Sequence, residues 1–252
     1  MAAIRHLVTV PLALCSFVGV FYAIGKLMVF LSLPVKIPIH QVWLVNLLDD
    51  WSKIETALLP LTTDAILIFA FILPHSFLRN DIFKSLLQRI GLSSASRCIY
   101  NLVTSASLLL LIGKWERVPS LTLWNFDVES NQILYWVYFT LHFVAWIVIY
   151  GGSIVMDLPE LTGVKQVYYD WNNLLHPLQY KSPQLVALYD HIRHPSFIGF
   201  SLILWFPNIM SFDRLLLAIL WTTYMFIAWR TDAQDVAYQR EQLQRKKAEL
   251  LK

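Results

Sequence analysis

Apolar residues in this chain fall into long blocks that are separated by short polar stretches. Because about twenty consecutive apolar residues cross the hydrocarbon core of a bilayer as a helix, each long block predicts a membrane-spanning helix. The blocks predict helices at 7–31, 57–74, 97–113, 133–156, 195–210 and 215–230. The last two are short, since sixteen helical residues reach only about 24 Å. The remaining stretch, 231–252, predicts a polar helix with a basic last third.

Composition supports the same interpretation. Hydrophobic residues make up 57% of the chain and charged residues only 15%, whereas a soluble domain carries about 25% charged residues. Backbone polar groups inside lipid must be hydrogen-bonded within their own segment, which favours helices. The sequence therefore predicts an all-α, multi-pass helical bundle, with about six transmembrane helices in a single domain over 1–252 and the lipid bilayer as its partner.

The distribution of basic residues predicts how the bundle is oriented. With six spans, the side that holds both termini carries fourteen Lys and Arg residues and the opposite side five. Cytoplasmic loops carry an excess of basic residues, so both termini are expected in the cytoplasm or the nucleoplasm. The net charge is only +3 and the chain has no dense basic tract, so nucleic acid is not expected as a direct partner.

Among the polar residues inside the predicted spans, Lys26, Asp64 and His142 stand out. Lys26 lies near the end of the first span, where snorkelling of its amine to the interface is the favoured interpretation. Asp64 either pairs with Lys26 or lines a polar cavity, because a charge in hydrocarbon is costly and needs a partner. His142 is expected to be a buried histidine with satisfied hydrogen bonds.

The densest polar chemistry lies in 157–197 and ends at Arg193, His194 and Pro195. Proline suits the first position of a helix, which places the arginine and histidine at a helix N-terminus. Free backbone N–H groups make such an end an anion site. The alternative is a basic pair that only marks a membrane boundary. No metal site is predicted, because the two histidines at 191 and 194 lack a thiolate or carboxylate partner.

An ordered set of motifs resembles the isoprenylcysteine carboxyl methyltransferase superfamily, and within it the nurim family. The first part of the set is Arg193-His194-Pro195-Ser196-Phe197-Ile198-Gly199, an apolar hairpin, and the acidic helix start from Thr231 to Asp235. Further matches are His75-Ser76, the stretch from Lys114 to Pro119, Leu161 to Tyr169, Tyr180 to Pro183, and Asp213 to Ala218. The resemblance runs from about residue 57 to residue 250.

This resemblance implies a methyltransferase-like C-terminal hairpin that encloses S-adenosylmethionine. In such a site Arg193 and His194, at the helix that Pro195 and Phe197 begin, would hold the carboxylate of the cofactor. The ribose and the base would lie against Gln166, Tyr168 and Tyr189. An acidic side chain, Asp232 or Asp235, would face the sulfonium or the substrate. The resemblance also implies a multi-pass protein of the inner nuclear membrane and endoplasmic reticulum continuum.

The chain departs from the enzyme pattern at two places. Phe197 stands where the superfamily usually has tyrosine, and Ala233-Gln234 replaces a Glu-Glu pair. Glutamine cannot act as a general base, so cofactor binding is favoured over turnover and the pocket is interpreted as vestigial. The alternative is an active membrane methyltransferase on a small thiol or a lipid-like substrate, with a hydrophobic small molecule as partner. A nicotinamide-dependent reductase and a channel rank lower.

Overall fold

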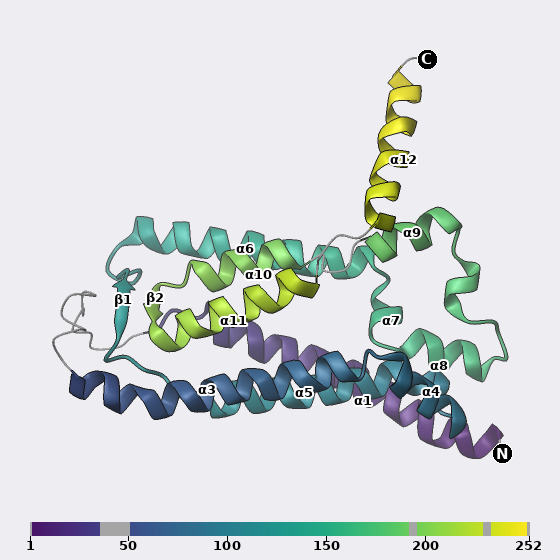
Figure 1. Cartoon of the computed structure of the whole chain (residues 1–252), viewed down its shortest axis with the longest axis horizontal. Helices are drawn as coiled ribbons and strands as arrows, with labels where there is room; N and C mark the ends of the chain where they lie inside the picture. Colours follow the sequence, from purple (N-terminus) through teal and green to yellow (C-terminus); the bar gives the residue numbers. More distant parts are fainter. Residues whose placement is uncertain (1, 36–50, 192–195, 229–232, 251–252) are drawn as a thin grey trace.

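The computed structural model describes residues 2–35, 51–191, 196–228 and 233–250. Its long helices run beside one another along the longest axis of the molecule (Figure 1). These are α1 (Ala2–Ser32), α3 (Trp51–Phe77), α5 (Ser96–Lys114), α6 (Gln132–Val155) and α11 (Phe212–Ala228). The shorter helices are α4 (Asp81–Arg89), η1 (Ser93–Ala95), α7 (Leu158–Leu161), α8 (Val164–Trp171), η2 (Pro177–Tyr180), α9 (Pro183–His191) and α10 (Phe197–Trp205). A last helix, α12 (Ala233–Leu250), leaves the bundle. The predicted all-α class is confirmed.

The bundle has two different ends (Figure 1). At one, called the strand end, β1 (Thr122–Asn125) pairs antiparallel with β2 (Ile209–Ser211). The other is called the α7–α9 end, because those helices lie there with the start of α1 and the end of α6. Helix α12 also begins at the α7–α9 end, so α1 and α12 both start on the same side of the bundle.

Among the described residues, four helices are long and apolar enough to span a membrane: 5–32, 52–77, 93–114 and 132–155. Only 22–33% of the most apolar window in each is buried. Exposed apolar surface on this scale is unfavourable in water and favourable in lipid, so the outer faces of these helices are lipid-facing. The chain is therefore an integral membrane protein.

The fifth and sixth predicted spans correspond to α10 and α11, with different bounds. Helix α10 has 9 residues, which reach about 14 Å, whereas the prediction ran from 195 to 210. It ends at Trp205 because Pro207 has no N–H to donate and disfavours helical geometry at the residue before it. Asp213 and Arg214, expected in the connecting turn, instead form the first turn of α11. Six crossings of the membrane stay a prediction.

The main core lies where α10 and α11 pack against α1, α3, α5 and α6. The closest approach is at Gly199 of α10, where an added Cβ would lie 2.6 Å from the Ala145 carbonyl oxygen and 2.6 Å from Cγ1 of Ile149. Only glycine allows α10 to lie this close to α6. Buried residues of the core are Ala23, Leu27, Leu31, Ile68, Phe71, Leu108, Leu111, Ala145, Trp146, Ile149, Ile203, Leu204, Leu217, Ala218, Trp221 and Met225.

The polar residues of the spans behave differently from one another. Lys26 is exposed, and its amine lies 5.6 Å from the centroid of the Tyr22 ring. Asp64 is fully buried and accepts a hydrogen bond from the backbone N–H of Glu116 at 2.9 Å. The ion pairs of the described residues do not include Lys26 with Asp64, so the pairing hypothesis was wrong.

His142 was expected to be a satisfied core histidine, and this is confirmed. It is 3% exposed. Its Nδ1 lies 2.8 Å from the hydroxyl oxygen of Ser32, and its Nε2 lies 3.1 Å from the Phe206 carbonyl oxygen. The histidine therefore links α1 and α6 to the end of α10.

Candidate functional site

The segment that carries the candidate site is fixed to the bundle through the end of α7. Arg97 and Asn101 of α5 both donate to the Leu161 carbonyl, at 3.1 and 2.9 Å. The hydroxyl of Ser16 in α1 donates to the Thr162 carbonyl at 2.8 Å and is itself fully buried. These bonds satisfy carbonyls at a helix C-terminus that have no partner within the helix. The position of the next helix, α8, is thereby tied to two spanning helices.

Two tight turns determine where the site residues lie. Gly163, between α7 and α8, has φ of +87°, and an added Cβ there would meet Sγ of Cys98 at 2.7 Å. Asp157, before α7, has φ of 64° and its side chain accepts from the N–H of Glu160. Aspartate tolerates this conformation better than most residues, and here it also caps the helix. Both turns bring polar side chains towards a single region beside α6.

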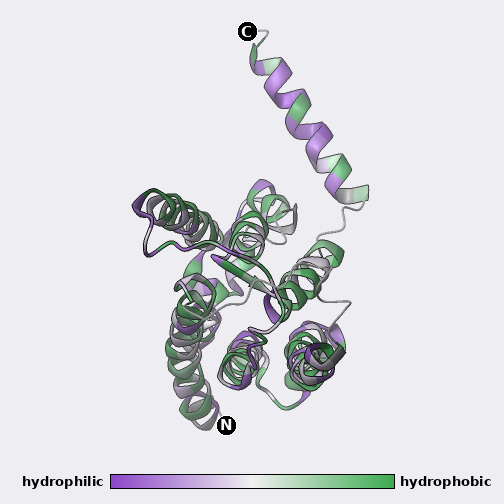
Figure 2. Ribbon diagram, turned by 90° about the vertical axis from the view of Figure 1, so that its left-hand side faces the viewer, coloured by the Kyte–Doolittle hydropathy of each residue, from purple (hydrophilic) through white to green (hydrophobic). Residues whose placement is uncertain are grey.

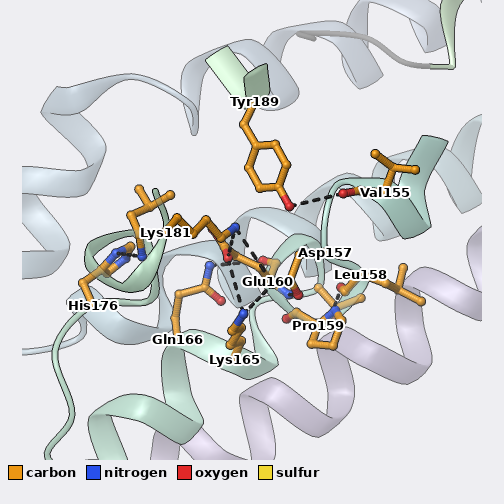
Figure 3. A network of polar contacts seen from close by, with 12 residues as sticks. Val155, Asp157, Leu158, Pro159, Glu160, Lys165, Gln166, His176, Lys181 and Tyr189 are labelled. Carbon is orange, nitrogen blue, oxygen red and sulfur yellow. Dashed lines mark hydrogen bonds and ion pairs between the residues drawn. The ribbon is translucent and has the colours of Figure 1, made fainter. Parts of the chain in front are cut away.

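Four charged side chains from α7, α8 and the end of η2 form a compact network (Figure 3). Lys165 donates to Oδ2 of Asp157, and Nζ of Lys181 forms an ion pair with Oε2 of Glu160 at 2.6 Å. The cross pairs are longer, at 4.0 and 3.9 Å. The hydrogen bond from Asp157 raises the pKa of Lys165 above its ordinary value. We call these four residues the α7–α9 cluster; its charges balance.

Two predicted cofactor-binding residues, Gln166 and Tyr189, join this cluster (Figure 3). The amide nitrogen of Gln166 donates to the Glu160 carbonyl at 3.1 Å. The phenol of Tyr189 donates to the Val155 carbonyl at 3.2 Å, and Nζ of Lys181 lies 4.1 Å from its ring centroid. Within the described residues, the side-chain oxygen of Gln166 is buried and has no hydrogen-bond partner. It is an acceptor available to a donor from outside the chain.

Three other predicted site residues are described. Tyr168 is 59% exposed and lies two positions from Gln166 on α8, so the two side chains point to different faces of the helix. Phe197 packs against the main core. Asp235 is 5% exposed at the start of α12, which contacts α9. The predicted residues Arg193, His194, Pro195 and Asp232 lie outside the described residues.

Asp157 and Glu160 belong to the site although neither was predicted as a site residue. The signal was present in the run Asp157-Leu158-Pro159-Glu160. An aspartate with a proline two positions after it and a glutamate three positions after it is typical of a helix start. That pattern predicts α7, and with it a carboxylate pair on either side of the helix N-terminus.

A second polar cluster lies at the strand end and is built around Asp213. Its Oδ2 accepts from the indole N–H of Trp115 at 2.9 Å, and its Oδ1 accepts from the Val118 N–H at 3.1 Å. The hydroxyl of Ser211 donates to the same Oδ1 at 2.5 Å. We call these four residues the strand-end cluster. It joins two stretches that carried the resemblance, 114–119 and 213–218.

Arg214 continues this buried region towards α1. It is 9% exposed, donates to the Phe30 carbonyl at 2.7 Å and lies 4.2 Å from the centroid of the Phe30 ring. A guanidinium group can combine a hydrogen bond with stacking on an aromatic face. Asp213 and Arg214 thus tie α11 to the chain after α5 and to the end of α1.

The spanning helices have lipid-facing outer surfaces, and a polar cluster lies at each end of their bundle. These features define a multi-pass helical membrane protein. The chain is 48% identical over 250 residues to a Nurim homolog of Drosophila melanogaster, and the alignment covers 99% of each chain. It is 36% identical over 253 residues to Nurim of Sus scrofa, covering 95% of this chain and 94% of the relative. The chain belongs to the nurim family. No family model matches it, and no solved structure matches it.

Proposed function

We propose that this nurim-family protein resides in the inner nuclear membrane and binds S-adenosylmethionine at its α7–α9 end without efficient methyl transfer. The observation that carries the proposal is the buried, unpartnered side-chain oxygen of Gln166 beside Tyr189. This oxygen is a hydrogen-bond acceptor without a donor, and a ribose hydroxyl or an adenine amino group could donate to it. Arg193 and His194 are assigned to the carboxylate of the cofactor by the sequence motif alone.

The geometry supports binding more strongly than turnover. Three of the predicted elements, α8, α9 and the start of α12, contribute Gln166, Tyr189 and Asp235 to the same end of the bundle. The cations of the described cluster are already paired with carboxylates. The departures at Phe197 and Gln234 remove a hydroxyl and a general base that a transfer reaction would use.

Calorimetric titration of the full-length protein in detergent with S-adenosylmethionine tests the proposal. We expect saturable binding that Gln166→Leu and Arg193→Ala each weaken at least tenfold, which is about 1.4 kcal/mol. Gln179→Leu is the matched control, because this glutamine is exposed on η2 and lies outside the predicted site, so its loss should leave the affinity unchanged. Absence of heat at millimolar cofactor, or equal effects of all three substitutions, would refute the proposed pocket.

The alternative function is an active methyltransferase, and the buried carboxylate of Asp235 favours it. In that reaction the sulfonium methyl moves to a thiolate, the carbon–sulfur bond of the cofactor breaks, and S-adenosylhomocysteine leaves with the bonding electron pair. The thiol proton passes to a base or to water. Transfer of radioactive methyl to a small thiol or a lipid extract, lost in Asp235→Asn, would replace the binding-only proposal.

The location is tested separately. A fluorescent fusion should give a nuclear rim, and a C-terminal epitope should be reached by antibody only after the inner nuclear membrane is permeabilised. Signal spread through the peripheral reticulum without a rim would overturn the nuclear assignment. A glycosylation acceptor sequence added at the C-terminus should stay unmodified, and its glycosylation, which takes place in the lumen, would overturn the predicted orientation of the termini.

A further inference from the structure

Helix α12 lies across the axes of the spanning helices, at the α7–α9 end (Figures 1 and 2). Its start contacts α9, and the rest of the helix projects beyond the outline of the bundle. Spanning helices tilt on average about 20° from the membrane normal. A helix that crosses their direction where α3 and α11 end therefore runs along the membrane surface and does not point away from it.

One face of α12 carries a narrow apolar stripe. Val236, Leu243 and Leu250 are spaced by seven positions and are 51%, 56% and 86% exposed. Because an ideal helix drifts by only about 20° per heptad, the three side chains share one face. Large apolar side chains repeated on one face of a projecting helix are typical of a surface that is covered by a partner.

The charges of α12 are segregated around this stripe. Arg240 and Lys247 follow Val236 and Leu243 by four positions, and Lys246 follows Leu243 by three, so all three lie along the stripe. The acidic residue nearest to the middle, Glu241, lies two positions from Leu243 and therefore on another face. It is paired there with Arg245 at 2.6 Å. The stripe is thus bordered by cations, while a carboxylate is held away from it.

We propose that α12 is an interfacial helix that lies in the headgroup layer of an anionic membrane, with its stripe towards the acyl chains. Apolar side chains flanked by Lys and Arg suit this position, because the long basic side chains reach back to phosphate groups while their stems cover hydrocarbon. The surface is the membrane that holds the spans. The inference does not depend on cofactor binding.

A second copy of the helix fits the stripe less well. A coiled-coil seam needs apolar residues at two positions of every heptad, but the positions three after the stripe residues are Gln239 and Lys246. A nucleic-acid surface would gain nothing from the leucines at the centre of the basic face, since phosphates attract the cations alone. The stripe is therefore too narrow for a helix partner and too apolar for a nucleic acid.

Spin labelling of the full-length protein in reconstituted bilayers tests the inference. Nitroxides are placed at Leu243→Cys and, as the matched control, at Glu241→Cys, both in a Cys15→Ser background. Oxygen dissolves in the bilayer, whereas a nickel chelate stays in water. In phosphatidylcholine with added phosphatidylserine, we expect the oxygen-to-nickel accessibility ratio at 243 to exceed that at 241 by at least about threefold.

The anionic preference has its own control. The oxygen-to-nickel accessibility ratio at 243 should be higher with phosphatidylserine than in phosphatidylcholine alone. Lys246→Glu together with Lys247→Glu should abolish this increase, whereas Arg245→Glu, on the outer face, should not. Equal water accessibility at 243 and 241 in both membranes would overturn the inference. Spin–spin broadening at 243 that disappears on dilution with unlabelled protein would also overturn it, because it would show that a second copy covers the stripe.

Discussion

The two polar clusters of the bundle use similar residues but differ in solvent access and in what their charges contact. At the strand end Asp213 is fully buried, and both its oxygens accept from uncharged donors. In the α7–α9 cluster the charged side chains are 7–25% exposed and contact one another. A carboxylate enclosed by backbone and indole N–H groups cannot exchange its partners without unfolding. The part-exposed ion-pair network of the α7–α9 cluster can exchange its partners without unfolding, and it lies beside the unpartnered oxygen of Gln166.

The comparison shows that a shared sequence motif does not determine where in the fold its residues lie. Residues 114–119 and 213–218 contributed to the same resemblance as 161–169, yet they lie at the opposite end of the bundle from α7 and α8. Their contacts with one another explain their presence without any ligand. In the α7–α9 cluster, by contrast with Asp213, whose two oxygens both accept hydrogen bonds, the neighbouring side-chain oxygen of Gln166 is buried and has no partner among the described residues.

The largest effect is expected from Asp213→Ala. It leaves the indole of Trp115 and the N–H of Val118 without their acceptor in a buried region, which should cost about 3–5 kcal/mol of the free energy of unfolding. Denaturant titration in mixed micelles, followed by tryptophan fluorescence, measures it. Asp81→Ala is the control, since that carboxylate is 94% exposed and its loss should leave the midpoint unchanged. Equal midpoints for both variants would remove the structural role assigned to the strand end.

Glycine substitutions give the next largest effect and probe the close packing between the two ends. Gly199→Ala places a Cβ 2.6 Å from the Ala145 carbonyl oxygen, and separating α10 from α6 should cost about 1–3 kcal/mol. Gly151→Ala is the matched change in α6, where the new Cβ meets nothing within 4 Å. It should stabilise the helix by about 0.5–1 kcal/mol. Thermal midpoints that move in the same direction would contradict this account of the α6–α10 contact.

The sequence predicted the spanning helices well, because their signal is strong and local. Apolar runs of bilayer length identify α1, α3, α5 and α6 to within a few residues at most ends. The bounds of α10 were harder to predict, since its apolar run continues past Trp205 although proline and pairing with β1 end the helix. Hydropathy does not report such a break, which depends on backbone hydrogen bonding with residues far away in sequence.

The candidate site was only partly predictable. Gln166 and Tyr189 were identified through the resemblance, and the structure brings both to one cluster. The ion pairs of Lys165 and Lys181 with α7 were missed, because they depend on two turns with positive φ that bring distant segments together. Charge alone places these lysines on one side of the membrane, and only the fold shows which carboxylates they contact.

Removing one partner of the α7–α9 cluster should have a moderate effect. In Lys181→Met the carboxylate of Glu160, 13% exposed, loses its nearest cation, and we expect a loss of about 1–2 kcal/mol. Lys84→Met, whose ion pair is on the surface, should cost at most about 0.5 kcal/mol. The two variants are compared by denaturant titration. If the two variants lose the same free energy of unfolding, the α7–α9 cluster contributes no more than a surface ion pair. The two ends would then differ only in the burial of Asp213 at the strand end.

The smallest effect is a dependence on pH that belongs to the α7–α9 end alone. The bond to Asp157 raises the pKa of Lys165 in the folded protein above its unfolded value. The stability that it contributes is therefore fully present below the unfolded pKa, about 10.5, and is lost as the pH rises through the folded pKa. Wild type and Lys165→Met should differ in thermal midpoint at pH 8, and the difference should shrink as the pH rises beyond the unfolded pKa and through the raised pKa of the folded protein. Wild type and Asp213→Ala should keep their difference over the same range, because the donors to Asp213 do not titrate there. A gap between wild type and Lys165→Met that stays constant to pH 12 would show that the lysine stabilises the fold by packing and that its charge contributes nothing.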